Sequence, residues 1–358
     1  MPASPVPCFP SPLVRRLKPR STAVGVQPNP QQQGWGTMTV RVAILDDYQN
    51  VALKLADWSK LGKDVEIKVY NDAIRRTPAE TIRDCKGFQV VSMMRERTPF
   101  PRQVIEALPD LKLLITTGAR NASIDMAACA ERGIVVCGTS SFGNPTVGIT
   151  FGLILELTRR VGWENARMKA GEKWQVTLGM DIEGTTLGVL GLGKLGTRAA
   201  GVGKAFGMKV MAWSQNLTPE KCKEAGVEYV SKEDLFRKAD FITIHLQLSP
   251  RTRGLVTATE LGLMKKTAYL INTSRGPIVD EKALLAALDA KSIAGAGLDV
   301  FDVEPLPTDH PFRKMDNVVI TPHLGYVSQQ NYAGYFPDIV DNIRGWMDGK
   351  PVRVIPAK

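Results

Sequence analysis

Short apolar runs alternate with amphipathic stretches along most of the chain. The runs in order are VRVAIL from Val40, VEIKVY, FQVVSMM, LKLLITT and GIVVC, and then TLGVL, KVMAW, DFITIHL, AYLINTS, AGLDVF and NVVIT. Each run has the length of a buried strand, and the stretches between most of them have helical spacing. This alternation predicts parallel strands joined by crossover helices, in two doubly wound α/β domains.

Two longer helical patterns flank the second series of runs. The segment from Val147 to about Lys169 predicts one long helix that links the domains. The tail from about Ser328 predicts an amphipathic helix that packs back on the first domain, with the apolar residues Tyr335, Ile339, Ile343 and Trp346 on one face. We therefore expect one domain at 38–138, completed by 326–358, and a second at 139–325.

The opening segment 1–37 is rich in Pro, Gln and Ser and has no acidic residue. This composition is typical of a disordered extension, or of an overlong start to the sequence ahead of Met38. It does not favour a packed segment. A targeting segment is the alternative, although the prolines disfavour an amphipathic helix.

A glycine motif follows the first strand of the second series. Gly191, Gly193 and Gly196 lie in GLGKLG, between the strand TLGVL and a helical stretch. In this context Gly191 permits a tight turn, Gly193 lets a pyrophosphate approach the backbone, and Gly196 lets the helix pack on the strand. The motif predicts a dinucleotide site, and a glycine turn that only packs a helix on a strand is the alternative.

Three residues whose side chains can bind a substrate or exchange a proton with it follow successive strands of the second series. Arg275 follows AYLINTS, Glu304 follows AGLDVF, and His323 follows NVVIT. Ligands of open parallel sheets bind outside the carboxyl ends of the strands, so we expect these side chains to converge near the cofactor. A guanidinium can hold the carboxylate and ketone of a 2-oxo acid, and an imidazole can exchange the proton. A carboxylate beside that imidazole orients the ring and raises its pKa.

The other histidines are weaker candidates for the proton exchange. His245 ends the strand DFITIHL and is expected near the cofactor, whereas His310, in PTDHPF, is expected in a turn or at the surface.

Charge and composition indicate which class of ligand the protein binds and in which cellular compartment it works. The 358 residues carry a net charge of +10, but the basic residues are spread along the chain, which favours anionic small molecules over nucleic acid. No apolar run approaches the ~20 residues that cross a bilayer, so no membrane partner is expected. The cysteines are odd in number and scattered, which suits a reducing cytoplasm and predicts no metal site: Cys8, Cys85, Cys129, Cys137 and Cys222.

From about Met38 to its end, the sequence resembles the D-isomer-specific 2-hydroxyacid dehydrogenase family. The resemblance rests on GLGKLG, on NTSRG at 272–276, on GLDVFDVEP at 297–305 and on TPHLG at 321–325, in family order and spacing. The chain is most similar to a short, phosphoglycerate dehydrogenase-like form that lacks the regulatory domain. The resemblance implies a flavodoxin-like substrate domain and a Rossmann domain with a cleft between them, in a homodimer formed through the cofactor domain and its long helix.

The same resemblance implies an enzyme that transfers a hydride between NAD(P) and a small D-2-hydroxy or 2-oxo acid. The substrates considered are 3-phosphoglycerate and glyoxylate or hydroxypyruvate. Arg275, Glu304 and His323 take the roles argued above, and Asp299 faces the nicotinamide amide. Further cofactor contacts are expected from Thr146, Lys194, Leu195, Ser214, His245, Thr252 and Thr273.

For the substrate, the resemblance points to the segment from Thr116 to Ala119. Thr117, Gly118 and Ala119 are expected to bind the carboxylate through the backbone. Arg95 matches a family arginine that faces the substrate phosphate in phosphoglycerate dehydrogenases, and a surface charge is the alternative.

Two positions depart from the family pattern. Ser214 replaces the usual acidic residue after the second strand, so NAD is expected and NADP is not excluded, and Gly148 stands where relatives have Glu. A dinucleotide-sensing corepressor on the same fold is the alternative function.

Overall fold

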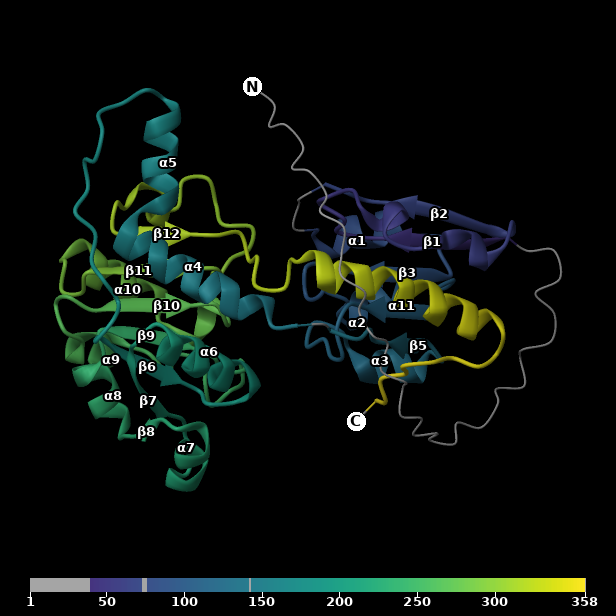
Figure 1. Cartoon of the computed structure of the whole chain (residues 1–358). Helices are drawn as coiled ribbons and strands as arrows, with labels where there is room; N and C mark the ends of the chain where they lie inside the picture. The colour runs from purple at the N-terminus through teal and green to yellow at the C-terminus, as the bar shows by residue number, and fades with distance from the viewer. Residues whose placement is uncertain (1–38, 73–75, 142, 358) are drawn as a thin grey trace. The chain divides into compact units, whose positions relative to one another are not determined.

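The computed structural model describes residues 39–72, 76–141 and 143–357. The predicted extension 1–37 lies outside the described residues. Within these ranges the strands form one sheet of five and one of seven, and neighbouring strands are parallel (Figure 1). The prediction of two doubly wound α/β domains is confirmed.

The first sheet has the order β2-β1-β3-β4-β5, which is that of flavodoxin-like folds. Its strands are β1 (Val40–Ile44), β2 (Val65–Val69), β3 (Val90–Met93), β4 (Leu113–Thr116) and β5 (Val135–Cys137). Its helices are α1 (Pro78–Cys85), α2 (Arg102–Glu106), α3 (Met126–Glu131) and the C-terminal α11 (Gln329–Met347).

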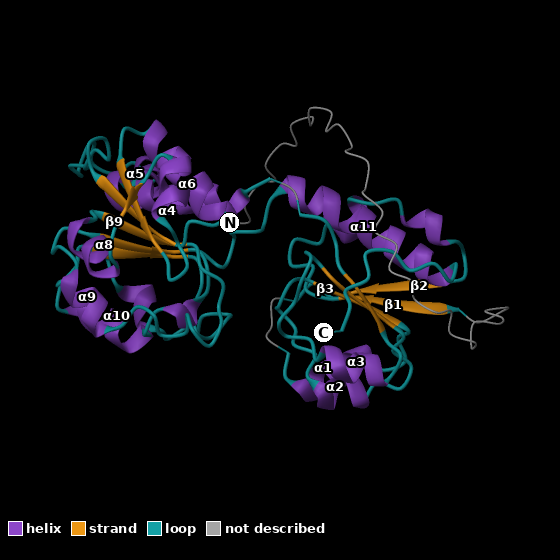
Figure 2. Ribbon diagram, turned by 90° about the horizontal axis from the view of Figure 1, so that it is seen from below, coloured by secondary structure: helices purple, strands orange, loops and turns teal. Residues whose placement is uncertain are grey.

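Both faces of this sheet are covered by helices. Figure 2 shows α1, α2 and α3 on one face and α11 on the other. In β1, Val42 and Ile44 pack in the apolar cluster that contains α11, whereas Ala43 and the next residue after the strand, Leu45, pack in the cluster that contains α1 to α3. Two-sided burial explains why the inner strands β3 and β4 read as nearly continuous apolar runs, whereas the edge strand β2 alternates apolar and charged residues.

The C-terminal helix is amphipathic and packs on the first sheet, as predicted. Ser328 caps it by accepting from the backbone N–H of Asn331. Tyr335, Ile339 and Ile343 are buried against the first sheet. After α11 the chain makes an antiparallel bridge between Val354 and Cys137.

The second sheet has the order β12-β11-β10-β9-β6-β7-β8. Its strands are β6 (Thr186–Leu190), β7 (Lys209–Trp213), β8 (Glu228–Tyr229), β9 (Phe241–Ile244), β10 (Tyr269–Asn272), β11 (Gly295–Leu298) and β12 (Val318–Ile320). The order of the strands reverses between β6 and β9, as it does in Rossmann folds. The ligand-binding switch point of such a sheet lies where the order reverses. The sequence did not predict β8, because this edge strand is short and both of its residues are exposed.

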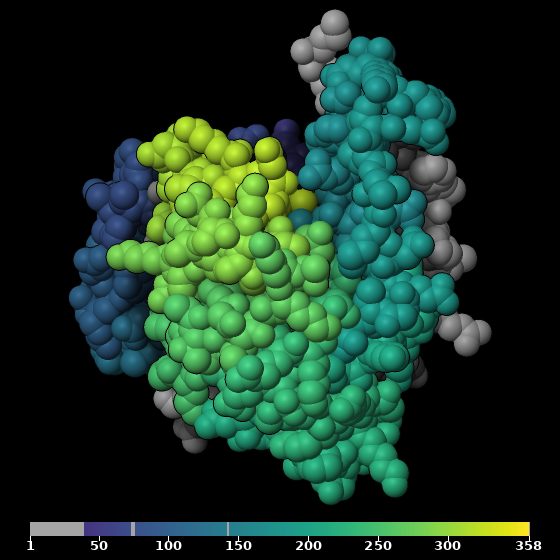
Figure 3. All heavy atoms as spheres, turned by 90° about the vertical axis from the view of Figure 1, so that its left-hand side faces the viewer, coloured from purple at the N-terminus to yellow at the C-terminus, as the bar shows by residue number. Residues whose placement is uncertain are grey.

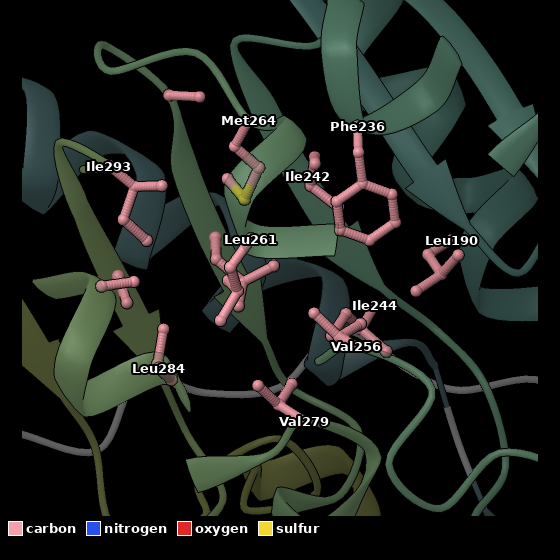
Figure 4. Close-up of a cluster of buried hydrophobic side chains, with 14 of the residues drawn as sticks. Leu190, Phe236, Ile242, Ile244, Val256, Leu261, Met264, Val279, Leu284 and Ile293 are labelled. Carbon is pink, nitrogen blue, oxygen red and sulfur yellow. The ribbon is translucent and has the colours of Figure 1, made fainter. Parts of the chain in front are cut away.

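Helices cover the second sheet on both faces as well. They are α6 (Lys194–Ala205), α7 (Pro219–Ala225), α8 (Lys232–Lys238), α9 (Ala258–Leu263) and α10 (Glu281–Asp289). Short 3₁₀ helices lie in the connections at Ala52–Lys54, Trp58–Leu61, Gly276–Ile278 and Pro311–Lys314. Figure 4 shows the core on one face, where Ile242 and Ile244 of β9 pack with Phe236, Leu261 and Leu284 of α8, α9 and α10.

The single linking helix predicted at 147–169 is instead two helices, α4 (Pro145–Arg159) and α5 (Val161–Lys169). Arg160 has a φ of 49°, in the left-handed region that ends a helix. The Glu156 carboxylate then accepts from the N–H groups of Gly162 at 2.6 Å and Trp163 at 3.2 Å, and so caps the new helix. Helix α4 packs on the second sheet, but α5 buries no residue and projects from the surface (Figure 3).

Candidate active site

The loop after β6 has the geometry of a phosphate-binding turn. Gly191 has a φ of 104°, which favours glycine. A Cβ on Gly196 would lie 2.0 Å from the backbone oxygen of Gly191, so α6 starts against β6 only because no side chain intervenes. At Gly193 the Cβ position is open and no side chain caps α6. The first N–H groups of α6 therefore fit the pyrophosphate of NAD.

Other predicted cofactor residues lie around this switch point. Lys194 and Leu195 form the start of α6, and Ser214 follows β7 and is half-buried. His245 follows β9, and its backbone oxygen would lie 2.9 Å from a Cβ on Gly191. Burial lowers the pKa of His245 to about 4, so the ring is neutral at pH 7. This makes His245 a poor proton donor.

The three predicted threonines use their hydroxyl groups within the protein. Thr252 donates to a carbonyl of its own loop at 2.6 Å, and Thr146 donates to the carbonyl of Gly325 at 2.6 Å. The Thr273 hydroxyl lies 3.0 Å from that of Thr150. Each hydroxyl oxygen keeps acceptor capacity, so contact with the cofactor stays a prediction.

His323 and Glu304 form a hydrogen-bonded pair. Nδ1 of His323 lies 2.7 Å from Oε2 of Glu304, whose Oε1 accepts from the backbone N–H of Phe301 at 3.0 Å. A carboxylate accepts only, so this contact places a proton on Nδ1 and directs Nε2 away. The ring of Tyr326 lies edge-on at 5.6 Å. No other residue in the described part of the chain hydrogen bonds Nε2.

The pKa values of this pair differ from the expectation in one respect. Burial raises the pKa of Glu304, but His323 and Arg97 lower it more, to about 2. Burial lowers the pKa of His323, Glu304 raises it as expected, and the guanidinium groups of Arg97 and Arg275 lower it again. The net pKa of His323 is below its ordinary value, because desolvation and two nearby cations outweigh one carboxylate.

Arg97, which follows β3, is an unexpected member of the site. Its Nη1 donates to Oε2 of Glu304, the oxygen that also faces His323. Its Nε donates to the hydroxyl of Tyr326 at 3.2 Å, and its guanidinium lies 5.4 Å from the centre of that ring. The first domain thus helps to fix the carboxylate that orients His323.

Arg275 lies in a tight turn after β10. The side chain of Asn272 fixes the turn by accepting from the N–H of Ser274 at 3.0 Å and donating to the carbonyl of Arg275 at 2.9 Å. The guanidinium donates through Nη1 to the carbonyl of Ser274 and through Nη2 to Oε2 of Glu96, both at 2.7 Å. The predicted substrate-binding arginine is therefore paired with a carboxylate from the first domain.

The predicted substrate loop lies beside Arg95. Arg95 has a φ of 53°, and its backbone N–H donates to the Thr117 hydroxyl at 2.9 Å. The guanidinium of Arg95 donates to the carbonyl of Thr117 at 3.3 Å and lies against Gly118. The N–H of Gly118 donates to the hydroxyl of Thr139 at 2.8 Å. Ala119 is exposed, whereas Thr117 and Gly118 are buried.

Asp299, predicted to face the nicotinamide, holds the loop that carries His323. Oδ1 accepts from the Thr321 hydroxyl at 2.6 Å and the Leu324 N–H at 2.7 Å, and Oδ2 accepts from the Gly325 N–H at 2.8 Å. Burial raises the pKa of Asp299 despite these hydrogen bonds. Its contact with the cofactor stays a prediction.

Sequence reasoning missed Glu96, Arg97 and Tyr326. Glu96 and Arg97 belong to a run of three charged residues directly after the buried strand β3, and this position is the signal that identifies them. His310 lies in a turn, as predicted, where Nδ1 accepts from the Phe312 N–H at 3.3 Å and Nε2 lies 3.2 Å from Glu281. Gly148 is exposed on α4, and nothing in the structure explains its replacement of Glu.

Among residues 39–72, 76–141 and 143–357, no group of three or more His, Cys, Asp and Glu side chains is placed to hold a metal ion. Over the same residues, no helix has both the length and the apolar character of a membrane span.

Comparison with known proteins identifies the family. Residues 151–325 match the model of the NAD-binding domain of D-isomer-specific 2-hydroxyacid dehydrogenases. The chain is 34% identical over 302 residues to a glyoxylate reductase from Korarchaeum cryptofilum, with 82% of this chain and 90% of that protein covered. It is 37% identical over 265 residues to a D-3-phosphoglycerate dehydrogenase from Synechocystis, which covers 73% of this chain but 47% of the longer relative.

Its structure resembles that of a phosphoglycerate oxidoreductase from Vibrio cholerae, with a TM-score of 0.81, 33% identity, and 86% of this chain and 99% of that chain covered. The chain therefore belongs to the D-isomer-specific 2-hydroxyacid dehydrogenases, NAD-dependent enzymes that act on the CH–OH group of 2-hydroxy acids or reduce the corresponding 2-oxo acids.

Proposed function

We propose that Arg275 binds the substrate of this enzyme, that His323 exchanges the proton with it, and that Glu304 orients His323. The observation that carries this proposal is the geometry of the His323 ring. Its Nδ1 is fixed 2.7 Å from Glu304, while Nε2 is left for a ligand. Arg275 is near enough to influence the pKa of that ring. A cation that binds a carboxylate therefore lies beside a group that transfers a proton.

Each of these residues would have a separate role in the reduction. Bound NADH supplies the hydride that reaches the carbonyl carbon of the 2-oxo acid. Arg275 binds the carboxylate and polarises the ketone, and the protonated His323 donates its Nε2 proton to the carbonyl oxygen. Glu304 stabilises the imidazolium before the transfer and keeps Nδ1 protonated afterwards. In the oxidation, the neutral ring takes the hydroxyl proton back.

For the substrate, we propose a small D-2-hydroxy acid or the corresponding 2-oxo acid, with 3-phosphoglycerate, glyoxylate and hydroxypyruvate as the candidates. The names of the relatives above support glyoxylate and 3-phosphoglycerate. Ala119 and Arg95 would contact the part of the substrate that faces the first domain.

We further propose a homodimer formed through the segment 161–180. This segment carries exposed large apolar side chains: Val161, Trp163, Met168, Trp174, Val176 and Leu178. A monomer rarely exposes this many large apolar side chains on one segment, and a two-fold contact between copies would bury them.

For domain boundaries, we propose a substrate domain at 38–138, completed by 326–358, and a dinucleotide-binding domain at 139–325. The shared apolar cluster of the first sheet and α11 supports the first, and the family match over 151–325 supports the second. We also propose that the enzyme is cytoplasmic, since the cysteines of the described residues are free and buried. The corepressor alternative gains no support from the relatives compared above, which are enzymes.

Turnover with a panel of 2-oxo acids tests the proposal. Purified protein should oxidise NADH in the presence of glyoxylate or hydroxypyruvate, and a His323→Asn variant should lose at least about 100-fold of that activity. Binding of NADH without turnover of any 2-oxo acid would contradict the proposal and favour the corepressor.

A further inference from the structure

Glu96 pairs with Arg275, the arginine proposed above to bind the substrate. Nη2 of Arg275 donates to Glu96 at 2.7 Å, and Nη1 donates to the protein's own backbone. Both side chains are about one third exposed, so a solute reaches them. The guanidinium has further N–H donors, so Arg275 can still bind a substrate carboxylate, which then lies close to the carboxylate of Glu96.

Glu96 also lies between two arginines. Burial raises the pKa of Glu96, but Arg275 and Arg95 lower it more, and the net pKa lies below its ordinary value. Glu96 is therefore ionised at neutral pH, with one negative charge between two positive ones. The third arginine of the site, Arg97, is already paired with Glu304.

We propose that Glu96 determines substrate specificity by selecting 2-oxo acids with a single anionic group. This inference rests on the function proposed above. Glu96 leaves one positive charge of the Arg95 and Arg275 pair uncompensated, and one substrate carboxylate neutralises it. These three side chains then carry no net positive charge for a second anionic group, such as a phosphate or a second carboxylate, and Glu96 repels that group.

This assignment separates the candidate substrates. Glyoxylate and hydroxypyruvate carry one carboxylate each, whereas 3-phosphohydroxypyruvate carries a phosphate as well. The enzyme should therefore act as a reductase of small monocarboxylic 2-oxo acids, and phosphorylated or dicarboxylic ones should be poor substrates.

The matched substrates hydroxypyruvate and 3-phosphohydroxypyruvate, which differ only in the phosphate, test the proposal. Steady-state kcat/KM is measured for both with NADH, at one salt concentration. Wild type should favour hydroxypyruvate, and Glu96→Gln should shift the ratio toward the phosphorylated substrate by at least about tenfold. Glu96→Asp keeps the charge and should keep the preference. The control is Glu66→Gln, which removes a surface carboxylate that pairs with Arg41 at 3.4 Å in the same domain and should leave the ratio unchanged.

The outcomes separate this inference from the proposed function. If wild type reduces hydroxypyruvate but Glu96→Gln leaves the ratio unchanged, or if wild type prefers the phosphorylated substrate, Glu96 does not determine specificity and the dehydrogenase function stands. If no 2-oxo acid is reduced, the proposed function fails. The preference for ligands with a single anionic group is then tested by measuring ligand binding. Calorimetry on NADH-loaded protein compares oxamate, which has one carboxylate, with tartronate, which has two. A gain in tartronate affinity relative to oxamate in Glu96→Gln supports the inference, and no relative gain overturns it.

Discussion

At the scale of the residue, the pKa of His323 is set by neighbours that act in opposite directions. One carboxylate raises its pKa, whereas burial and the guanidinium groups of Arg97 and Arg275 lower it. The imidazolium supplies the proton for reduction, so a lowered pKa makes less of the reactive form available at neutral pH. A bound substrate carboxylate would offset the charge of Arg275 and raise the pKa when the proton is needed.

The pH dependence of reduction tests this balance. The value of kcat/KM for reduction should fall as pH rises through the pKa of His323, because the proton donor is lost. Glu304→Gln removes the carboxylate that raises this pKa and should move the fall to lower pH by about one unit or more. Arg97→Gln removes a cation that lowers the pKa and should move the fall to higher pH. Shifts of both variants in the same direction would contradict the assigned roles.

Arg275 differs from a lysine in geometry and not in charge. Arg275→Lys keeps the positive charge but loses the planar fork that holds a carboxylate and a ketone together. We expect kcat/KM to fall by the equivalent of roughly 2 to 4 kcal/mol. Arg237→Lys, on the exposed side of α8, is the control and should behave as wild type. Nearly full activity in Arg275→Lys would mean that a point charge is sufficient and that the fork does not orient the substrate.

We expect Ser214 to influence the choice between NAD and NADP. A carboxylate at this position accepts from the ribose hydroxyls and repels a 2′-phosphate, whereas a serine does not repel it. Ser214→Asp should leave kcat/KM for NAD largely intact and lower it for NADP by about tenfold, or roughly 1.4 kcal/mol. Asn216→Asp places the same charge two residues further on, where the side chain is exposed, and should have a smaller effect. An unchanged NADP to NAD ratio in Ser214→Asp would show that the side chain does not face the ribose.

At the scale of the element, the contact between β6 and α6 depends on glycine. A Cβ on Gly196 would overlap the backbone oxygen of Gly191, whereas a Cβ on Gly201 in the same helix would meet nothing within 4 Å. Gly196→Ala should lower the free energy of unfolding by roughly 1 to 3 kcal/mol and weaken NADH binding, because α6 must move away from β6. Gly201→Ala should raise the free energy of unfolding by about 0.5 to 1 kcal/mol through helix propensity. Denaturant unfolding and NADH fluorescence titration measure both, and equal effects of the two substitutions would exclude the close packing.

At the scale of the whole molecule, the projecting segment 161–180 should hold two copies together. A double variant Trp174→Asp/Leu178→Asp places charges in its exposed apolar surface and should convert the dimer to a monomer in sedimentation velocity. Leu53→Asp, which adds a charge to an exposed apolar residue of the first domain, is the control. A monomeric wild type, or a double variant that stays dimeric, would remove this segment from the interface.

The sequence by itself determined the glycine loop, the residues that end the strands of the second sheet, and every strand of both sheets except the short edge strand β8. These features depend on local rules. Apolar periodicity and the conformational freedom of Gly191 act over a few residues, and parallel strands bring their carboxyl ends to one edge of a sheet. Arg275, Glu304 and His323 were predicted from their positions alone, and the structure brings Glu304 and His323 into contact.

Only the tertiary structure decided the partners and the pKa of these groups. Arg97 and Glu304 are 207 residues apart in sequence, and Glu96 and Arg275 are 179 apart, so no local pattern pairs them. The direction of the His323 pKa shift depends on how deeply the ring is buried and on which cations lie near it, and both follow from packing between distant segments. The break at Arg160 is instead a local feature that apolar periodicity did not predict, because the cap from Glu156 forms only when the helix ends there. The sequence therefore determined which chemical groups are present and where they lie on the fold, whereas their charge states and partners were decided by the contacts that folding creates.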